Sequence, residues 1–123
     1  MKQEDKKLLL QDLCGRLPYG VVLECCEIVG EQLRSIDDKG LINNDYDIDE
    51  VKPLLFPLSS MTKEQSTIYH ELVHGMFGTS VLINLDCLID FFNRNHLDWR
   101  GLIPLGLAID ATNKNVYGYE TRG

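Results

Sequence analysis

The sequence is short of basic residues. It has 12 Lys and Arg against 19 Asp and Glu in 123 residues, which gives a formal net charge of −7. This balance argues against a sequence-independent grip on DNA or RNA and against attraction to anionic membranes, because both need cations. An acidic surface keeps a protein soluble, and it could also occupy a basic nucleic-acid site on another protein. We therefore expect no direct nucleic-acid binding, with an acidic decoy of nucleic acid as an alternative.

Long apolar runs and paired-cysteine motifs are also missing. No stretch approaches the roughly 20 apolar residues that cross a bilayer, and the start "MKQEDKKLLLQDL" lacks the apolar core of a signal peptide. The cysteines Cys14, Cys25, Cys26 and Cys87 form no C-x-x-C pair. We expect buried, reduced thiols in a cytoplasmic protein without a membrane span. Phosphate-binding glycine loops, dinucleotide fingerprints and nucleophile elbows are absent from the sequence.

What is present is the composition of one ordinary globular domain. Hydrophobic residues make up 44% of the chain and charged residues 25%. The length suits one core, and no repeat or linker divides it. We predict a single α+β domain over residues 1–123, with about three helices packed on one face of a small, mostly antiparallel sheet.

Three helices are expected, over residues 4–13, 63–76 and 85–96. Gly15 is a plausible stop for the first helix, and Pro18 forbids its continuation. Thr62 and Gln65 have the spacing of a capping box at the start of the second helix. Asn84 is a candidate cap for the third.

Strands are expected over residues 19–29, 31–37, 79–84 and 105–109, with Gly30 in a turn between the first two. Pro53 and Pro57 confine their segment to an edge strand or an extended connection. The stretch "NDYDIDE" alternates Asp with other residues and fits either a strand or a loop. It resembles the start of a calcium loop, but Glu50 stands where that loop needs glycine.

The segment "HELVH" contains the H-E-x-x-H pattern of zinc proteases. His70 and His74 lie one helical turn apart and can share a zinc ion, and Glu71 can activate a metal-bound water. No third ligand stands at a diagnostic spacing, and at about 100° per residue both imidazoles project roughly opposite the apolar stripe of the helix. We interpret the pattern as accidental and expect no cofactor. The alternative is a zinc-dependent hydrolase.

Two segments are candidates for contact with a partner, Pro53–Met61 and His96–Leu102. Tryptophan and arginine are enriched at interface hot spots, so Trp99 and Arg100 form a possible recognition patch. They can instead be structural, with Trp99 filling the core and Arg100 paired with a local carboxylate. The candidate contact residues are Pro53, Pro57, Ser59, Ser60, Trp99 and Arg100.

Three stretches share a pattern with a known group of proteins: "LLLQDLCGRLPYGV", "KPLLFPLSSMTKEQ" and "FFNRNHLDWRGLIPLGLAIDA". In order and spacing they resemble a family of small uncharacterised proteins of gut anaerobic bacteria, found in phage-like or mobile regions. Phe56 and Trp99 stand where that family usually has Arg and Tyr, and the second His of H-E-x-x-H is not part of its pattern. The resemblance implies a phage- or mobile-element-associated accessory protein, and it implies no established activity.

The sequence alone therefore favours a cytoplasmic interaction protein that binds an unknown protein partner. The sequence leaves enzymatic activity open, but it favours a protein without catalytic activity.

Overall fold

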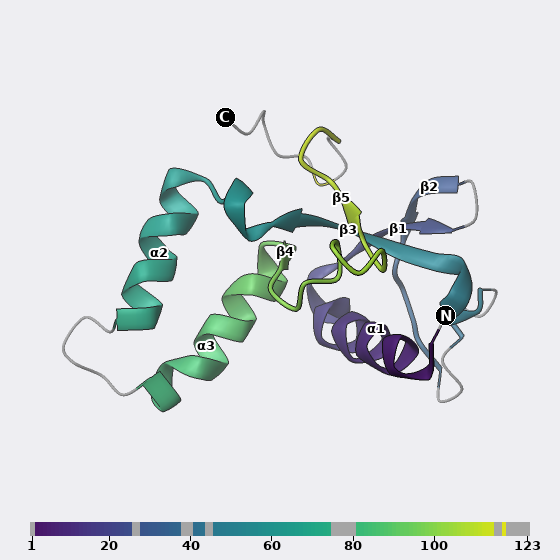
Figure 1. The fold of residues 1–123 in the computed structure, drawn as a ribbon, viewed down its shortest axis with the longest axis horizontal. Coiled ribbons are helices and arrows are strands. Elements are labelled where there is room, and N and C mark those ends of the chain that lie inside the picture. The colour runs from purple at the N-terminus through teal and green to yellow at the C-terminus, as the bar shows by residue number, and fades with distance from the viewer. Residues whose placement is uncertain are drawn as a thin grey trace.

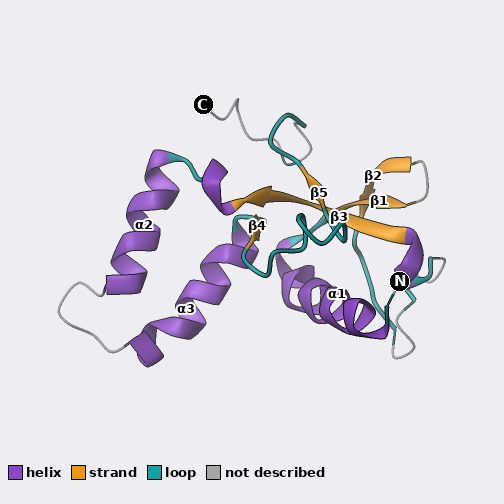
Figure 2. Ribbon diagram, in the orientation of Figure 1, coloured by secondary structure: helices purple, strands orange, loops and turns teal. Residues whose placement is uncertain are grey.

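The computed structural model describes residues 2–25, 28–37, 41–43, 46–74, 81–114 and 117, with the backbone alone for residues 28–29, 74 and 81–85. Its helices are α1 (Gln3–Arg16), α2 (Lys63–His74) and α3 (Val81–Arg94). Its strands are β1 (Val22–Cys25), β2 (Ile28–Gln32), β3 (Val51–Pro57), β4 (Leu97–Asp98) and β5 (Ile109–Asp110). Short 3-10 turns are η1 (Leu17–Tyr19), η2 (Ile48–Glu50) and η3 (Leu58–Ser60). The α+β class is confirmed: three helices accompany one mixed sheet whose longer ladders are antiparallel (Figures 1 and 2).

β1 and β2 form an antiparallel hairpin that reverses between Cys25 and Ile28, whereas the sequence predicted one strand over residues 19–29 and a second over residues 31–37. The apolar run continues through both strands, so hydrophobicity alone does not reveal the reversal. The register passes from Leu23↔Glu31 to Glu24↔Val29 and leaves Gly30 as an extra residue. Gly30 has φ of +109°, a value that favours glycine, so it forms a β-bulge inside β2 and not the predicted turn.

β3 is the strand with which three others pair. β1 pairs with its first three residues, β5 with its middle two and β4 with its last two. The prediction that Pro53 and Pro57 confine this segment to an edge is therefore wrong. Phe56 donates its N–H to the residue before β4, whereas the Leu55 carbonyl accepts from the residue after β5. Successive strand residues direct their backbone groups to alternate edges, so both prolines place their missing N–H away from β4.

Tyr117 closes the seam where β1 and β3 stop pairing. Their ladder ends at Leu23↔Pro53. At the next position, the Tyr117 hydroxyl accepts from Val22 N–H at 2.9 Å and donates to the Leu54 carbonyl at 2.7 Å. Its ring stacks on His96, with the centroids 3.8 Å apart. A side chain from the end of the chain thus satisfies two buried backbone groups of the sheet.

The core consists of two clusters on different sides of β3. Leu55 belongs to the first cluster with Leu9 and Leu13 of α1, and Leu54 belongs to the second with Phe92 of α3. Adjacent strand residues face opposite ways. The expectation that all helices share one face of the sheet is therefore wrong, because α1 and α3 pack against opposite-facing residues of β3.

The helix ends test the local predictions. The capping box is confirmed: Thr62 Oγ1 accepts from Gln65 N–H at 3.1 Å, and Gln65 Oε1 accepts from Thr62 N–H at 3.0 Å. Gly15 is not a stop, since α1 continues to Arg16. Asn84 is not a cap, because α3 begins at Val81, and the predicted strand over 79–84 is helical from residue 81. Residues 75–80 lie outside the described part of the chain.

The cysteine prediction fails at two of the described positions. Cys25 is buried, but Cys14 and Cys87 are exposed. Cys26 lies outside the described residues. Among the helices that the structure describes, none is long and apolar enough to pass through a bilayer.

Candidate functional site

The H-E-x-x-H segment lies on α2, with its first two members facing solvent. His70 is exposed, as the helical wheel predicted; Glu71 is also exposed, and Leu72 is half-buried. The His70 ring lies edge-on to the Tyr69 ring, with centroids 5.7 Å apart. The His74 side chain lies outside the described residues. Within the described part of the chain, no three His, Cys, Asp or Glu side chains gather as a metal site would require.

The two predicted contact segments lie side by side because β3 pairs with β4. Phe56 is in register with Leu97, and Pro57 with Asp98. Of the residues expected to contact a partner, Pro53 is buried, so its assignment to a surface is wrong. Pro57 is half-buried at the end of the strand. The η3 turn that follows exposes Ser59, and the hydroxyl of its neighbour Ser60 donates to the Pro57 carbonyl at 2.8 Å.

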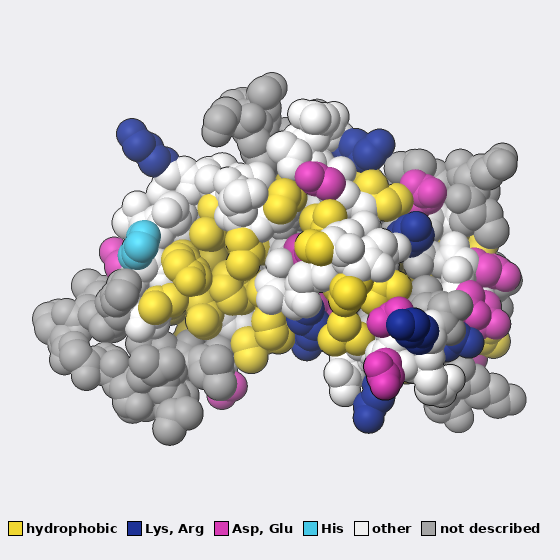
Figure 3. All heavy atoms as spheres, viewed as in Figure 1, with side chains coloured by type: hydrophobic (Ala, Val, Ile, Leu, Met, Phe, Trp, Pro, Cys, Tyr) yellow, Lys and Arg dark blue, Asp and Glu magenta, His cyan; other side chains and the backbone are white. Residues whose placement is uncertain are grey.

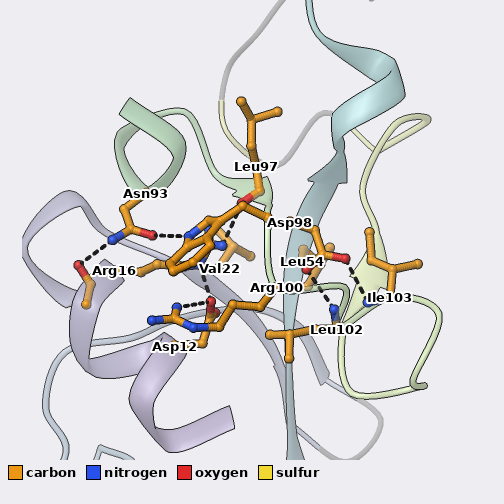
Figure 4. Close-up of polar contacts among 12 residues, drawn as sticks. Asp12, Arg16, Val22, Leu54, Asn93, Leu97, Asp98, Arg100, Leu102 and Ile103 are labelled. Carbon is orange, nitrogen blue, oxygen red and sulfur yellow. Dashed lines mark hydrogen bonds and ion pairs between the residues drawn. The ribbon is translucent and has the colours of Figure 1, made fainter. Parts of the chain in front are cut away.

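Asp98 organises the turn after β4. One carboxylate oxygen accepts from Leu102 N–H at 2.8 Å, and the other accepts from Ile103 N–H at 2.9 Å. Asp98 is buried, so these two donors replace the water that its charge would otherwise require. Asp98 therefore fixes the turn that carries Trp99 and Arg100 (Figure 4).

Trp99 is fixed on three sides. One face of its ring stacks on Phe92, with centroids 6.1 Å apart and planes 17° apart. The Arg100 guanidinium carbon lies 4.0 Å from the ring centroid, a cation–π distance. The indole N–H donates to Asn93 Oδ1 at 3.1 Å. Trp99 thus packs against the core, as the structural alternative expected, and is half-buried.

A buried charge cluster joins α1 to this turn (Figure 4). Asp12 and Arg16 are fully buried, and Arg16 Nε donates to Asp12 Oδ2 at 2.8 Å. Arg16 Nη2 donates to the Leu97 carbonyl at 2.6 Å, and Arg100 Nη1 donates to Asp12 Oδ1 at 2.8 Å. Arg100 therefore pairs with a carboxylate 88 residues away and not with the local one that was expected.

Sequence reasoning missed Asp12 and Arg16, although a signal was present. Leu9, Asp12, Leu13 and Arg16 are the buried residues of α1, and they follow the i, i+3, i+4, i+7 spacing of an inward-facing stripe. Two opposite charges four residues apart inside such a stripe indicate a buried ion pair. Asn93 of α3 also joins its helix to α1, because its side-chain amide donates to the Gly15 carbonyl. No comparable pattern in the sequence indicated this role.

Beside this cluster, five half-buried side chains form an apolar surface that we name the aromatic face. They pack on the second core cluster from α2, α3 and the segments next to them: Met61, Tyr69, Leu72, Leu88 and Trp99. Tyr69 and Phe92 lie with ring centroids 5.9 Å apart, so a row of aromatic contacts runs from α2 through α3 to Trp99. Figure 3 shows hydrophobic side chains gathered over α2 and α3, with acidic side chains and also Lys or Arg side chains at the border.

Comparison of the chain with protein-family models, with curated proteins and with solved structures gives no match.

Proposed function

We propose that this protein is an accessory protein that acts by binding another protein through the aromatic face, without catalysis. The single observation that supports the proposal is the aromatic row in which the half-buried Tyr69 and Trp99 both contact the buried Phe92. The association with phage-like or mobile genetic regions rests on the resemblance of the three sequence stretches described above.

Rigidity favours binding because ordering side chains on association costs free energy. An immobilised, rotamer-rich side chain costs about 0.5–1.5 kcal/mol. Trp99 is already held by Phe92, Arg100 and Asn93, so that cost has been met in folding. Aromatic residues fixed in this way are the usual anchors of protein interfaces.

The orientation of Trp99 also narrows the class of partner. Nucleic-acid bases stack on an open aromatic face. The Trp99 ring already stacks with Phe92 and carries the Arg100 guanidinium carbon 4.0 Å from its centroid, so less of the ring is open to a base. The net charge of −7 also opposes binding of phosphate, so a protein partner is favoured.

The experiment compares capture of host proteins by wild type and by variants of the face. Leu72→Ser and Leu88→Ser reduce the apolar area of the face, whereas Leu105→Ser removes an apolar side chain that is 54% exposed and is not part of it. Quantitative mass spectrometry should find proteins retained by wild type and Leu105→Ser but lost with Leu72→Ser and Leu88→Ser. Far-UV circular dichroism checks that each variant is folded. Identical capture by all four proteins would contradict the proposal.

A further inference from the structure

The aromatic face belongs to a helical hairpin that projects from the sheet (Figure 1). α2 packs against α3, and Gln65 near the start of α2 donates to Asn95 just beyond the end of α3 at 3.1 Å. The helices are therefore antiparallel. A third helix can lie across such a pair by the packing of ridges into grooves that joins the first two.

Acidic side chains border the apolar surface of this hairpin. Ile68 is 40% exposed on α2, with Glu64 four residues before it and Glu71 three residues after it. Residues at these spacings are neighbours on a helix surface. Asp86 is exposed one turn before the half-buried Ile89 of α3.

The Lys and Arg residues of the hairpin balance only two of its four described carboxylates. Arg94 forms an ion pair with Asp90 on α3 itself. Lys63 at the start of α2 is the other described basic side chain of the two helices. The described, exposed surface of the hairpin therefore carries excess negative charge beside an apolar surface.

We propose that the aromatic face binds an amphipathic helix of a partner protein, whose apolar stripe is bordered by Lys or Arg. This inference rests on the proposed function and names its partner class. The net charge of each possible binding partner distinguishes between them. A second copy of the chain has the same net charge of −7 and the same acidic border, and anionic lipid or nucleic acid also adds negative charge. A cationic amphipathic helix matches both the apolar row and the carboxylates.

The test uses a fluorescein-labelled helical peptide of about 18 residues, enough for five turns, with Leu at every third or fourth position and Lys between. The control peptide has Glu in place of every Lys. Fluorescence anisotropy with the full chain should show binding of the Lys peptide at least about tenfold tighter than binding of the Glu peptide, and the difference should narrow as salt rises.

Variants locate the binding. Ile68 lies one helical turn before Leu72 of the aromatic face. Ile68→Ser should weaken the Lys peptide about tenfold, as expected for the loss of one apolar contact. The double variant Glu64→Lys/Glu71→Lys should weaken it by a similar factor at low salt. A matched double variant, Glu4→Lys/Glu50→Lys, makes the same change in net charge at exposed positions of α1 and η2, and it should stay within about twofold of wild type. Equal losses in both double variants would mean non-specific attraction and would overturn the inference.

The two proposals fail in different ways. Suppose that Leu72→Ser loses a captured host protein but the Lys and Glu peptides bind wild type equally. The proposed class of partner is then wrong, whereas the aromatic face is still the binding surface. If light scattering shows wild type to be a dimer and Ile68→Ser a monomer, the occupant is a second copy and the inference is wrong. If no variant of the face alters capture, the proposed function itself fails.

Discussion

Removing the carboxylate of Asp12 should destabilise the protein more than any surface charge substitution. Asp12 is fully buried and accepts hydrogen bonds from Arg16 and Arg100, both at 2.8 Å. In Asp12→Ala the fully buried Arg16 guanidinium keeps its charge without a counter-ion. Breaking a buried ion pair by removing one partner costs about 3–5 kcal/mol. For a chain of this length, total stability is roughly 6–18 kcal/mol, so the loss is a large share of it.

Urea denaturation followed by far-UV circular dichroism measures this loss. With a slope of about 2 kcal/mol per molar urea, a loss of about 4 kcal/mol lowers the midpoint by about 2 M. Lys6→Ala is the control, because Lys6 and Asp49 form a partly exposed pair with side chains 35% and 42% accessible. It should change the free energy of unfolding by less than about 1 kcal/mol.

A double substitution tests the cause of the effect. Asp12→Leu/Arg16→Met removes both charges and keeps apolar volume, so it should be more stable than Asp12→Ala. Arg100, at 19% side-chain exposure, is close enough to the surface to turn toward water in this variant. A midpoint for Asp12→Ala equal to that of Lys6→Ala would refute the reasoning, as would a double variant no more stable than the single one.

Three further outcomes are expected. Tyr117→Phe should lose about 1–3 kcal/mol, because the buried Val22 N–H and Leu54 carbonyl lose their shared partner, and hydrogen exchange at the Val22 amide should accelerate relative to amides of α1. Thr62→Ala should lose about 1 kcal/mol through the missing helix cap, measured by thermal denaturation with Thr67→Ala, a non-capping threonine of the same helix, as the control. Protein purified without a His-tag should contain well under one zinc per chain by elemental analysis. Stoichiometric zinc that disappears in His74→Ala together with a hydrolytic activity would instead support the zinc hydrolase. Partner capture that is lost already at a small rise in salt concentration would support the decoy of nucleic acid, because salt screens charge attraction.

Interactions between residues close in sequence were predictable. The capping box needs only Thr62 and Gln65 at a fixed spacing, and both hydrogen bonds are present. The exposure of His70 followed from the helical wheel in the same way. The role of Trp99 was predicted in part: its packing on the core was one of the two alternatives, and its place in a contact surface stays a prediction.

Interactions that depend on distant parts of the chain were not predictable. The position of β3 is set by its pairing with β1, β4 and β5, so two prolines that suggest an edge are tolerated where their missing N–H groups point away from β4. Arg100 found Asp12 on α1, 88 residues away, and no local pattern connects them. The start of α3 was placed late because the apolar residues before Asn84 fit a strand as well as a helix.

The Tyr117 hydroxyl at the seam between β1 and β3 has a consequence for synthesis of the protein. Tyr117 is translated after every residue of the five strands. Until then, Val22 N–H and Leu54 C=O lack the hydroxyl that joins them in the folded protein. Water or another hydroxyl can occupy that position until the tyrosine arrives. The Tyr117 ring can therefore take its place beside His96 only after all five strands have been translated.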